Sequence, residues 1–338
     1  MRHRSPRSNG FSLIELLIVI GIVGLLIQLL LPAVMLSRES ARKVSCSNNL
    51  RQIGLAAQAH HEAQGFYPSG GWMPMWVGDP LRGFGQDQPG GWIYSLLPYV
   101  EAKAIHRLPD DGDAVAITPE QKAKAAGMTR IPVPLFQCPS RRPPRAYPYW
   151  LGNPWQTHNA DDADKVARSD YAANGGDYYD DDFPFFVETK VIDWTSYSSF
   201  DAAVKWASTS HMNGICFVRS EVASQDVSDG LTYTYLIGEK YLNSSYYHNG
   251  SDPGDNHSMY QGYDKDIIRW AGPNLKPLAD RQRKDISENF GSVHPNGFHM
   301  ILCGGSVKRI SYDVNLTVHQ RMANRSDGEP ISQMSDDP

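Results

Sequence analysis

The sequence predicts an α+β protein, in which a long N-terminal helix starts in a membrane and then packs on an antiparallel β-sheet head with extended loops. Three observations support this prediction. An apolar run occupies residues 13–31, an apolar stripe with helical spacing follows it, and apolar and polar residues alternate in two stretches of the last third of the chain. With 338 residues, the chain is long enough to bury a large core.

Between Leu13 and Leu31, only Glu15 and Gln28 interrupt a run of leucine, isoleucine, valine and glycine. A run of about 20 apolar residues can cross a hydrocarbon core of about 30 Å. Three arginines and no acidic residue precede the run, so the positive-inside rule places the N-terminus in the cytoplasm. We therefore expect a single-pass protein of the cytoplasmic membrane, in contact with its lipid, whose head is exported.

The helix is expected to continue beyond the membrane over residues 34–65. Apolar residues there recur at spacings of four, three and four, which defines one helical face: Cys46, Leu50, Ile53 and Ala57. Gly65 is a typical helix stop. The stripe therefore predicts a helix extension that packs against the head.

The head is expected to occupy residues 66–325, followed by a flexible polar tail over 326–338. Its first part, 66–92, is rich in glycine, proline and tryptophan, which predicts a loop. A short helix or strand is expected between Trp92 and His106. Residues 131–190 have no clear period and are predicted to be irregular.

A short helix is predicted over 119–126. Thr118 can cap it, Pro119 suits its first position, and Gln121 can close a capping box. Gly127 is expected to end it.

Strands are expected in the last third of the chain. Apolar side chains alternate with threonines after the turn Asp229-Gly230, which predicts a strand over 231–237. Residues 298–303 alternate in the same way, and Gly304-Gly305 then precedes a second alternating run. This pattern predicts a hairpin with a primed turn, in which both glycines have positive φ.

The chain is mildly acidic, with 37 acidic and 32 basic residues and a net charge of −5. Nucleic-acid binding requires a basic face, so the composition argues against nucleic acid as a partner. Acidic runs at 161–162 and 180–182 could form a calcium loop. The EF-hand spacing is absent, so we expect solvated acidic loops instead, and no other cofactor is indicated.

The four cysteines are widely spaced, and none belongs to a C-x-x-C pair: Cys46, Cys138, Cys216 and Cys303. Such spacing predicts neither a zinc site nor a thioredoxin-like motif. An oxidising compartment makes disulfides plausible, and four cysteines can pair in three ways.

No catalytic constellation is recognisable, and we expect no enzymatic activity. His61-Glu62 begins like a zinc-protease helix, but Gly65 stands where the second histidine should be. Ser306 lacks the second glycine of a nucleophile elbow. We expect His294 to hydrogen-bond a neighbouring strand or loop rather than to bind a metal.

The segment Gly10-Phe11-Ser12-Leu13-Ile14-Glu15 closely resembles the type IV prepilin and pseudopilin signal. The resemblance implies that a prepilin peptidase removes residues 1–10, that Phe11 is then N-methylated, and that the helix over 11–33 serves assembly with other pilin-like subunits. It also implies that Glu15 pairs with the terminal amine of a neighbouring subunit. The alternative is a plain signal anchor that carries a stray glutamate.

Further segments resemble a large planctomycete family of prepilin-type proteins that is defined by a C-terminal H-x9-DG motif. The family is a domain of unknown function, also classified as solute-binding-like. The segments that carry the resemblance lie at residues 46–55, 96–99, 138–140, 171–175, 229–239 and 294–297.

The chain departs from the family pattern twice. Nine residues separate His294 from Gly304-Gly305, so a glycine replaces the Asp of the motif. We expect that Asp to shape the turn rather than to act as a ligand or catalyst. Residues 231–234 replace a Thr-Ser-Asn-Thr-like run. Because Cys46 and Cys138 both lie in family segments, the resemblance favours a disulfide between them. Cys216 and Cys303 are then the residual pair.

The resemblances imply a structural subunit of a type IV pilus or of a type II secretion pseudopilus. A surface-displayed binding module for glycans or other solutes is the alternative. Two aromatic-rich loops, 72–76 and 147–150, motivate it, although we expect their rings to pack on the head's own surface. An exported hydrolase is a third hypothesis, and no motif supports it.

Overall fold

The computed structural model describes residues 13–149, 157–181, 183, 185–282 and 286–331. The expected leader, with Gly10 and Phe11, lies outside the described residues, as does Trp150. The chain divides into two units, Met1–Val44 and Ser45–Pro338. The unit that contains the head therefore begins well before residue 66 and includes part of the expected helix extension.

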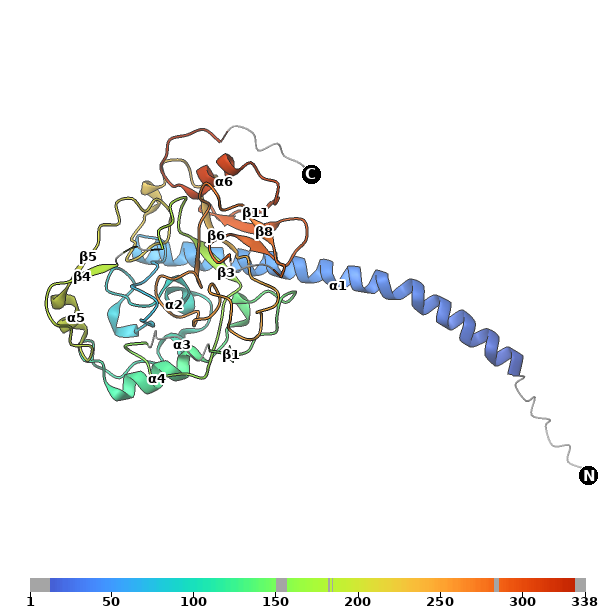
Figure 1. Ribbon diagram of the computed structural model, residues 1–338, viewed down its shortest axis with the longest axis horizontal. Coiled ribbons are helices and arrows are strands. Elements are labelled where there is room, and N and C mark those ends of the chain that lie inside the picture. Colours follow the sequence, from blue (N-terminus) through green and yellow to red (C-terminus); the bar gives the residue numbers. More distant parts are fainter. Residues whose placement is uncertain (1–12, 150–156, 182, 184, 283–285, 332–338) are drawn as a thin grey trace, which may run out of the picture. The chain divides into compact units, whose positions relative to one another are not determined.

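Helix α1 runs without interruption from Leu13 to Gln64 and has Pro32 in its interior (Figure 1). It is the one helix among the described residues that is long and apolar enough to cross a membrane. Its large apolar side chains between Leu13 and Leu36 are exposed. The predicted membrane helix and its extension are thus one continuous element.

The part of α1 that belongs to the second unit buries the predicted apolar stripe. Its four members are fully buried: Cys46, Leu50, Ile53 and Ala57. Gly54 lies on the same face, where a Cβ would overlap the side chain of Ile301. The absence of a side chain at Gly54 therefore allows the helix to approach the sheet closely.

The main sheet has five strands in the order β11-β10-β6-β3-β7. All neighbours are antiparallel except β3 and β7. The strands are β3 (Tyr171–Asn174), β6 (Tyr235–Glu239), β7 (Ile268–Arg269), β10 (Phe298–Leu302) and β11 (Val307–Ile310). The α+β class is as predicted, but β3 lies within the segment predicted to be irregular, and that prediction is wrong.

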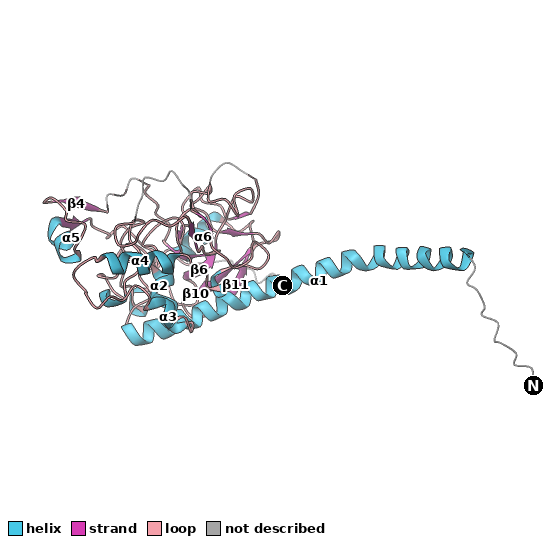
Figure 2. Cartoon of the chain, turned by 90° about the horizontal axis from the view of Figure 1, so that it is seen from below, coloured by secondary structure: helices cyan, strands magenta, loops and turns pink. Residues whose placement is uncertain are grey.

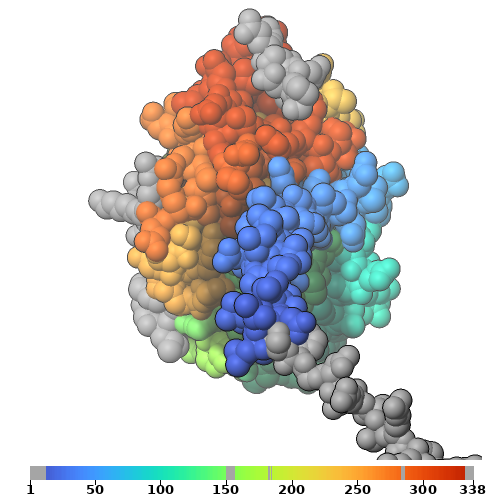
Figure 3. Space-filling view, turned by 90° about the vertical axis from the view of Figure 1, so that its right-hand side faces the viewer, coloured from blue at the N-terminus to red at the C-terminus, as the bar shows by residue number. Residues whose placement is uncertain are grey.

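Side chains alternate between the two faces of this sheet. Ile237 and Ile301 share a core cluster with Leu50 and Ile53 of α1, whereas Met300 and Leu302 pack on the other face, in the cluster of α6 (Leu316–Ala323). Figure 2 shows β6, β10 and β11 between the C-terminal part of α1 and α6. In the space-filling view, the C-terminal segment, orange to red, adjoins the light-blue end of α1 (Figure 3).

Strand β6 begins four residues later than predicted. The N–H groups of Tyr233 and Thr234 donate to the carbonyl oxygen of Gly230, at 3.0 and 3.2 Å, and this turn takes up residues 231–234. Residues 231–234 therefore form a turn despite their alternating pattern, because their backbone hydrogen bonds go to Gly230 and not to a neighbouring strand.

The hairpin of β10 and β11 is confirmed, but its predicted turn type is wrong. Gly305 has φ 87°, whereas Gly304 is not among the glycines with positive φ. Gly305 N–H donates to the Leu302 carbonyl at 2.8 Å, and Leu302 N–H donates to the Ser306 carbonyl at 2.9 Å. This is the longer connection in which a single left-handed residue forms a bulge.

The remaining helical elements are short. Thr118 caps α4 as predicted, but the helix continues past Gly127, and the Gln121 side chain donates to Asp79 and Tyr197 instead of closing a capping box. The segment from Trp92 to His106 is helical. These elements are η1 (Pro80–Arg82), α2 (Trp92–Leu96), η2 (Leu97–Tyr99), α3 (Lys103–His106), α4 (Pro119–Thr129), η3 (Pro134–Phe136), α5 (Tyr197–Ala203) and η4 (Ser224–Asp226).

Three two-stranded pairs complete the described head. They are β1 (Tyr147–Pro148) with β2 (Lys165–Val166), β4 (Phe186–Glu188) with β5 (Val204–Trp206), and β8 (Leu278–Ala279) with β9 (Gly291–Ser292).

The loop that follows α1 is buried. Trp72 and Trp76 have no exposed surface and form a second core cluster with Tyr197 and Phe200 of α5. Tyr147, in the other aromatic-rich loop, is also buried. These rings are thus part of the head's own packing and are not available for stacking on a glycan.

Candidate functional site

A disulfide joins Cys46 of α1 to Cys138, which follows η3, with a Cα–Cα distance of 5.4 Å. It is the pair that the family segments favoured, and both cysteines are buried. The residual pairing is not seen, because Cys216 and Cys303 are buried free thiols. The disulfide therefore attaches the segment after η3 to the buried face of the helix.

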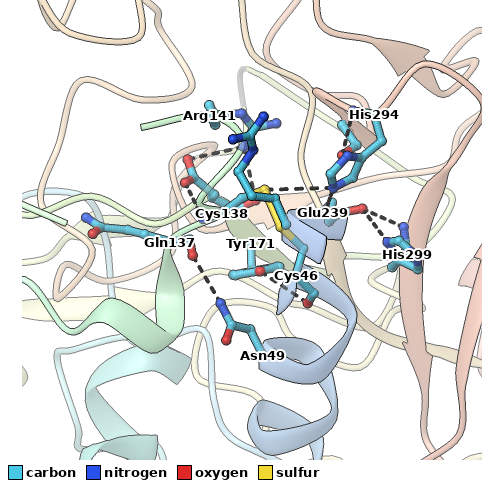
Figure 4. The surroundings of a disulfide bond; sticks show 12 residues. Cys46, Asn49, Gln137, Cys138, Arg141, Tyr171, Glu239, His294 and His299 are labelled. Atoms are coloured by element: carbon cyan, nitrogen blue, oxygen red, sulfur yellow. Dashed lines mark hydrogen bonds and ion pairs between the residues drawn. A yellow bond between two sulfur atoms is a disulfide. The ribbon is translucent and has the colours of Figure 1, made fainter. Parts of the chain in front are cut away.

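Hydrogen bonds position the backbone on both sides of the disulfide (Figure 4). Cys138 N–H donates to Oδ2 of Asp170 at 2.7 Å. Asn49 Nδ2 donates to the Gln137 carbonyl at 3.1 Å, and the Tyr171 hydroxyl donates to the Cys46 carbonyl at 3.3 Å. The backbone at both cysteines is thus held by bonds other than the sulfur–sulfur bond.

Two histidines and a glutamate lie against the disulfide. His294 Nε2 is 3.8 Å from Cys138 Sγ and 3.5 Å from Glu239 Oε1. The other carboxylate oxygen, Oε2, accepts from the backbone N–H of His299 at 2.7 Å and lies 3.1 Å from its Nδ1. The prediction that His294 contacts a neighbouring strand fits this position, since Glu239 ends β6.

Glu239 is a buried anion. Burial by itself would raise its pKa, but the interactions with His294 and His299 outweigh burial and hold the pKa at about 2. Its side chain and that of His294 are each 1% exposed. The carboxylate is therefore charged at neutral pH, with two imidazoles as its partners.

A network of buried ion pairs flanks this cluster. Oδ1 of Asp170 forms ion pairs with Arg141 at 3.2 Å and with Arg142 at 2.8 Å, and Arg141 also reaches Asp280 at 2.9 Å. Arg142 is bidentate on Asp255, so these charges are paired as buried charges must be. Burial would raise the pKa of Asp255, but Arg142 and Lys240 lower it well below its usual range. The network ties the residues after Cys138 to distant parts of the head.

Five of the six family segments thus meet at one place. Cys46, Cys138, Tyr171, Glu239 and His294 come from five different segments, and all of them are buried within this cluster. The H-x9-DG motif itself is divided, because its histidine precedes β10 and its glycines follow the strand. The two ends of the motif therefore lie at opposite ends of β10.

The cluster also contains a set of metal-ligand types. One ligand atom each from Cys46, Cys138, Glu239 and His294 lies within 4.8 Å of the other three, and all four residues are buried. Cysteine spacing had indicated no zinc site. Spacing could not reveal this set, because its members come from separate segments and two of them are not cysteines.

The described residues of the acidic runs are on the surface. Asp161 and Asp162 are exposed, and Asp181 pairs with Lys265 at 2.9 Å. Among the residues that the structure describes, the cysteine–glutamate–histidine set is the one group of three or more acidic, histidine or cysteine residues close enough to share a metal ion.

A separate open cavity of about 530 Å³ lies in the head. Aromatic and methionine residues line much of it, together with charged residues. The lining includes Met73, Met75, Tyr179, Phe183, Phe185, Asp264, Lys265 and Trp270. Its volume is within the usual range for small-molecule sites.

Glu15 lies in the first turn of α1, on an exposed part of the helix. No described contact tests its predicted role, and Gly10 and Phe11 lie outside the described part of the chain. The processing and assembly residues therefore remain predictions from the motif.

Comparisons with known proteins agree with both resemblances. The model of a family described as a protein of unknown function, DUF1559, matches residues 36–317. A model of the prokaryotic N-terminal methylation motif matches residues 5–27. No curated protein and no solved structure matches the chain.

Proposed function

Because the chain belongs to the DUF1559 family and carries the prokaryotic N-terminal methylation motif, we propose that it assembles through α1 into a pilus or a secretion pseudopilus. The motif makes it a type IV pilin-like, membrane-anchored subunit. Assembly is the further step, and it rests on the chemistry of the helix.

The exposed apolar surface of α1 is the observation that carries the proposal. Leu13, Leu29 and Leu36 are 83%, 68% and 71% exposed, and the apolar side chains between them are exposed all around the helix. Burying a large aliphatic side chain is worth about 1.5–3 kcal/mol, so lipid or neighbouring helices must cover this surface. A pilin-like filament supplies neighbouring helices after the subunit leaves the membrane.

Glu15 would set the axial alignment of neighbouring α1 helices. A carboxylate within a membrane span costs about 2.5–3.5 kcal/mol, and such residues usually serve a function. After cleavage, Phe11 would carry the new amino terminus, four residues before Glu15, about one helical turn away. A neighbouring subunit's terminal amine would neutralise the carboxylate and align adjacent helices.

Mass spectrometry and cell fractionation test the proposal together. Mature protein from membranes should begin with N-methylated Phe11, and mechanically sheared filament fractions should contain the same species. A chain that still starts at Met1, or one that is cut beyond Ala33, would contradict processing. Mature protein that is present in membranes but absent from every sheared or crosslinked assembly would contradict the filament role.

The open cavity favours a second candidate, a surface-displayed binding module for small solutes. Its lining combines the aromatic residues Tyr179 and Phe185 with the charged residues Asp264 and Lys265, which suits a ligand with both apolar and polar groups, such as a glycan. Screening the full-length chain in detergent against a glycan and solute library, with Phe185→Ala as the matched variant, tests this reading. Binding that is unchanged in Phe185→Ala, or no binding at all, would count against it.

A further inference from the structure

We propose that the reduced head binds one Zn²⁺ ion through the thiolates of Cys46 and Cys138, the imidazole of His294 and the carboxylate of Glu239. The disulfide and the metal site are then two alternative states of the same buried side chains. Two thiolates, one imidazole and one carboxylate are ligands of the types that tetrahedral zinc takes from proteins.

The distances already approach those of a zinc tetrahedron. Zinc bonds of about 2.3 Å to sulfur and about 2.0–2.2 Å to nitrogen and oxygen place neighbouring ligand atoms about 3.4–3.8 Å apart. Cys138 Sγ is 3.8 Å from His294 Nε2, which is 3.5 Å from Glu239 Oε1. The other ligand-atom distances are at most 4.8 Å, and the two sulfur atoms must move apart when the metal binds.

The backbone does not depend on the disulfide for its position. Asp170 holds the N–H of Cys138, Tyr171 holds the carbonyl of Cys46, and Asn49 holds the carbonyl of Gln137. Asp170 is itself held by Arg141 and Arg142. The four ligands should therefore stay together when the sulfur–sulfur bond is absent.

Glu239 is oriented as metal ligands usually are. Its Oε2 is occupied by the two contacts to His299, which leaves Oε1 on the side of the cysteines. Among the described residues, this buried Oε1 has no hydrogen-bond donor within ordinary range, and its nearest ionic contact is His294 at 3.5 Å. His299 thus acts as the outer partner that fixes a ligating carboxylate.

Replacement of the disulfide by the zinc site leaves the net charge of this buried cluster unchanged. In the disulfide state, the two sulfur atoms and the carboxylate of Glu239 together carry one negative charge. In the metal state, two thiolates and the carboxylate carry three negative charges and Zn²⁺ carries two positive charges, so the sum is again −1. The surrounding ion pairs therefore face the same net charge in both states.

The chemistry balances without a reductant, because the chain is synthesised with thiols. Zn²⁺ displaces the two thiol protons when it binds. A disulfide oxidant of the exported compartment later accepts two electrons from the two thiolates, the sulfur–sulfur bond forms, and Zn²⁺ is released.

Cobalt binding to the full-length chain in detergent tests the proposal. After reduction by a phosphine without oxygen, the wild-type chain should bind one Co²⁺ ion, with the visible bands of a tetrahedral site and a thiolate charge-transfer band. Zn²⁺ should displace the cobalt. The oxidised chain should show no such bands, and reoxidation with an organic disulfide should release one ion for each disulfide formed.

Matched variants assign the ligands. The double variant Cys216→Ala with Cys303→Ala should bind as the wild type does, because those buried thiols have raised pKa values and lie outside the set. His294→Gln should weaken binding at least tenfold while near-UV circular dichroism stays native. Cys46→Ser with Cys138→Ser should abolish binding.

Three results would overturn the proposal. One is a reduced chain that keeps its native circular dichroism and binds no metal. Another is binding that persists without Cys46 and Cys138 or disappears without Cys216 and Cys303. The last is a reduced chain that loses its native circular dichroism even with equimolar Zn²⁺, since the site must survive reduction.

Discussion

Gly304 donates a backbone hydrogen bond of 2.6 Å to the carbonyl oxygen of Leu231. These residues belong to the two places where the chain departs from the family pattern, and the structure brings the two places into one contact. A Cβ at Gly304 would lie 3.2 Å from the same oxygen and 3.5 Å from a carbon of Thr232. The departures are therefore neighbours in space, and a change at one position alters the packing at the other.

The two glycines of the hairpin should respond differently to substitution. Gly305 has φ 87°, so Gly305→Ala should lower the free energy of unfolding by about 1–2 kcal/mol. Gly304→Ala is the matched control. Its small steric conflict is partly offset because alanine makes the unfolded chain less flexible, so we expect the free energy of unfolding to change by less than about 1 kcal/mol. Urea unfolding of the full-length chain in detergent measures both. Equal losses would contradict the turn geometry described above.

Glu239→Gln should change the acid dependence of stability. The pKa of Glu239 is lowered from 4.5 to about 2 in the folded chain. A carboxyl whose pKa is lower in the folded than in the unfolded chain stabilises the fold at any pH above its unfolded pKa. For Glu239 this contribution is about 3 kcal/mol, and it is lost as the pH falls from about 4.5 to about 2. We therefore expect the variant to be less stable than the wild type at pH 7, and the difference to shrink as the pH approaches 3.

Urea unfolding at several pH values checks this expectation, and Glu329→Gln, an exposed site, serves as its control. The control should differ little from the wild type at any pH. A destabilisation by Glu239→Gln that stays constant from pH 7 to pH 3 would show that the charge of the carboxylate is not what matters.

Removal of the disulfide should destabilise the head. The Cys46–Cys138 bond closes a loop with a sequence separation of 92 residues, so Cys46→Ser with Cys138→Ser should cost about 4 kcal/mol in the chain-entropy model. Cys216→Ala, which removes a buried free thiol, should cost less than about 1.5 kcal/mol. Non-reducing peptide mapping first establishes the pairing. Free thiols at both positions in exported protein would refute the structural role of the bond.

Glu15 should be needed for assembly and dispensable for insertion. Glu15→Ala removes a charge from the apolar run, so membrane insertion and leader removal should be unaffected. The yield of sheared filaments should fall at least tenfold, because the pairing with a neighbouring amine is lost. Gln28→Ala changes the other polar residue of the run and should leave the yield unchanged. A normal filament yield from Glu15→Ala would refute the assembly role.

Several elements were predictable because their signals are local. The apolar run and the stripe of Cys46, Leu50, Ile53 and Ala57 follow from side-chain periodicity, and both lie in α1 as expected. The cap at Thr118 and the hairpin of β10 and β11 depend on residues that are neighbours in sequence. The alternating pattern at residues 231–234 predicted a strand, and this prediction is wrong because hydrogen bonds to Gly230 form a turn there.

The sequence by itself determined the membrane helix, its buried stripe and the hairpin, since each depends on contacts within a few residues. Only the tertiary structure decided that Trp72 and Trp76 are core residues, that β3 pairs inside the main sheet, and that Glu239 faces His294 and the disulfide. These contacts join residues that lie tens to hundreds of positions apart. These contacts are stabilised by burial and charge pairing in the folded head. The spacing of residues along the chain therefore does not predict them.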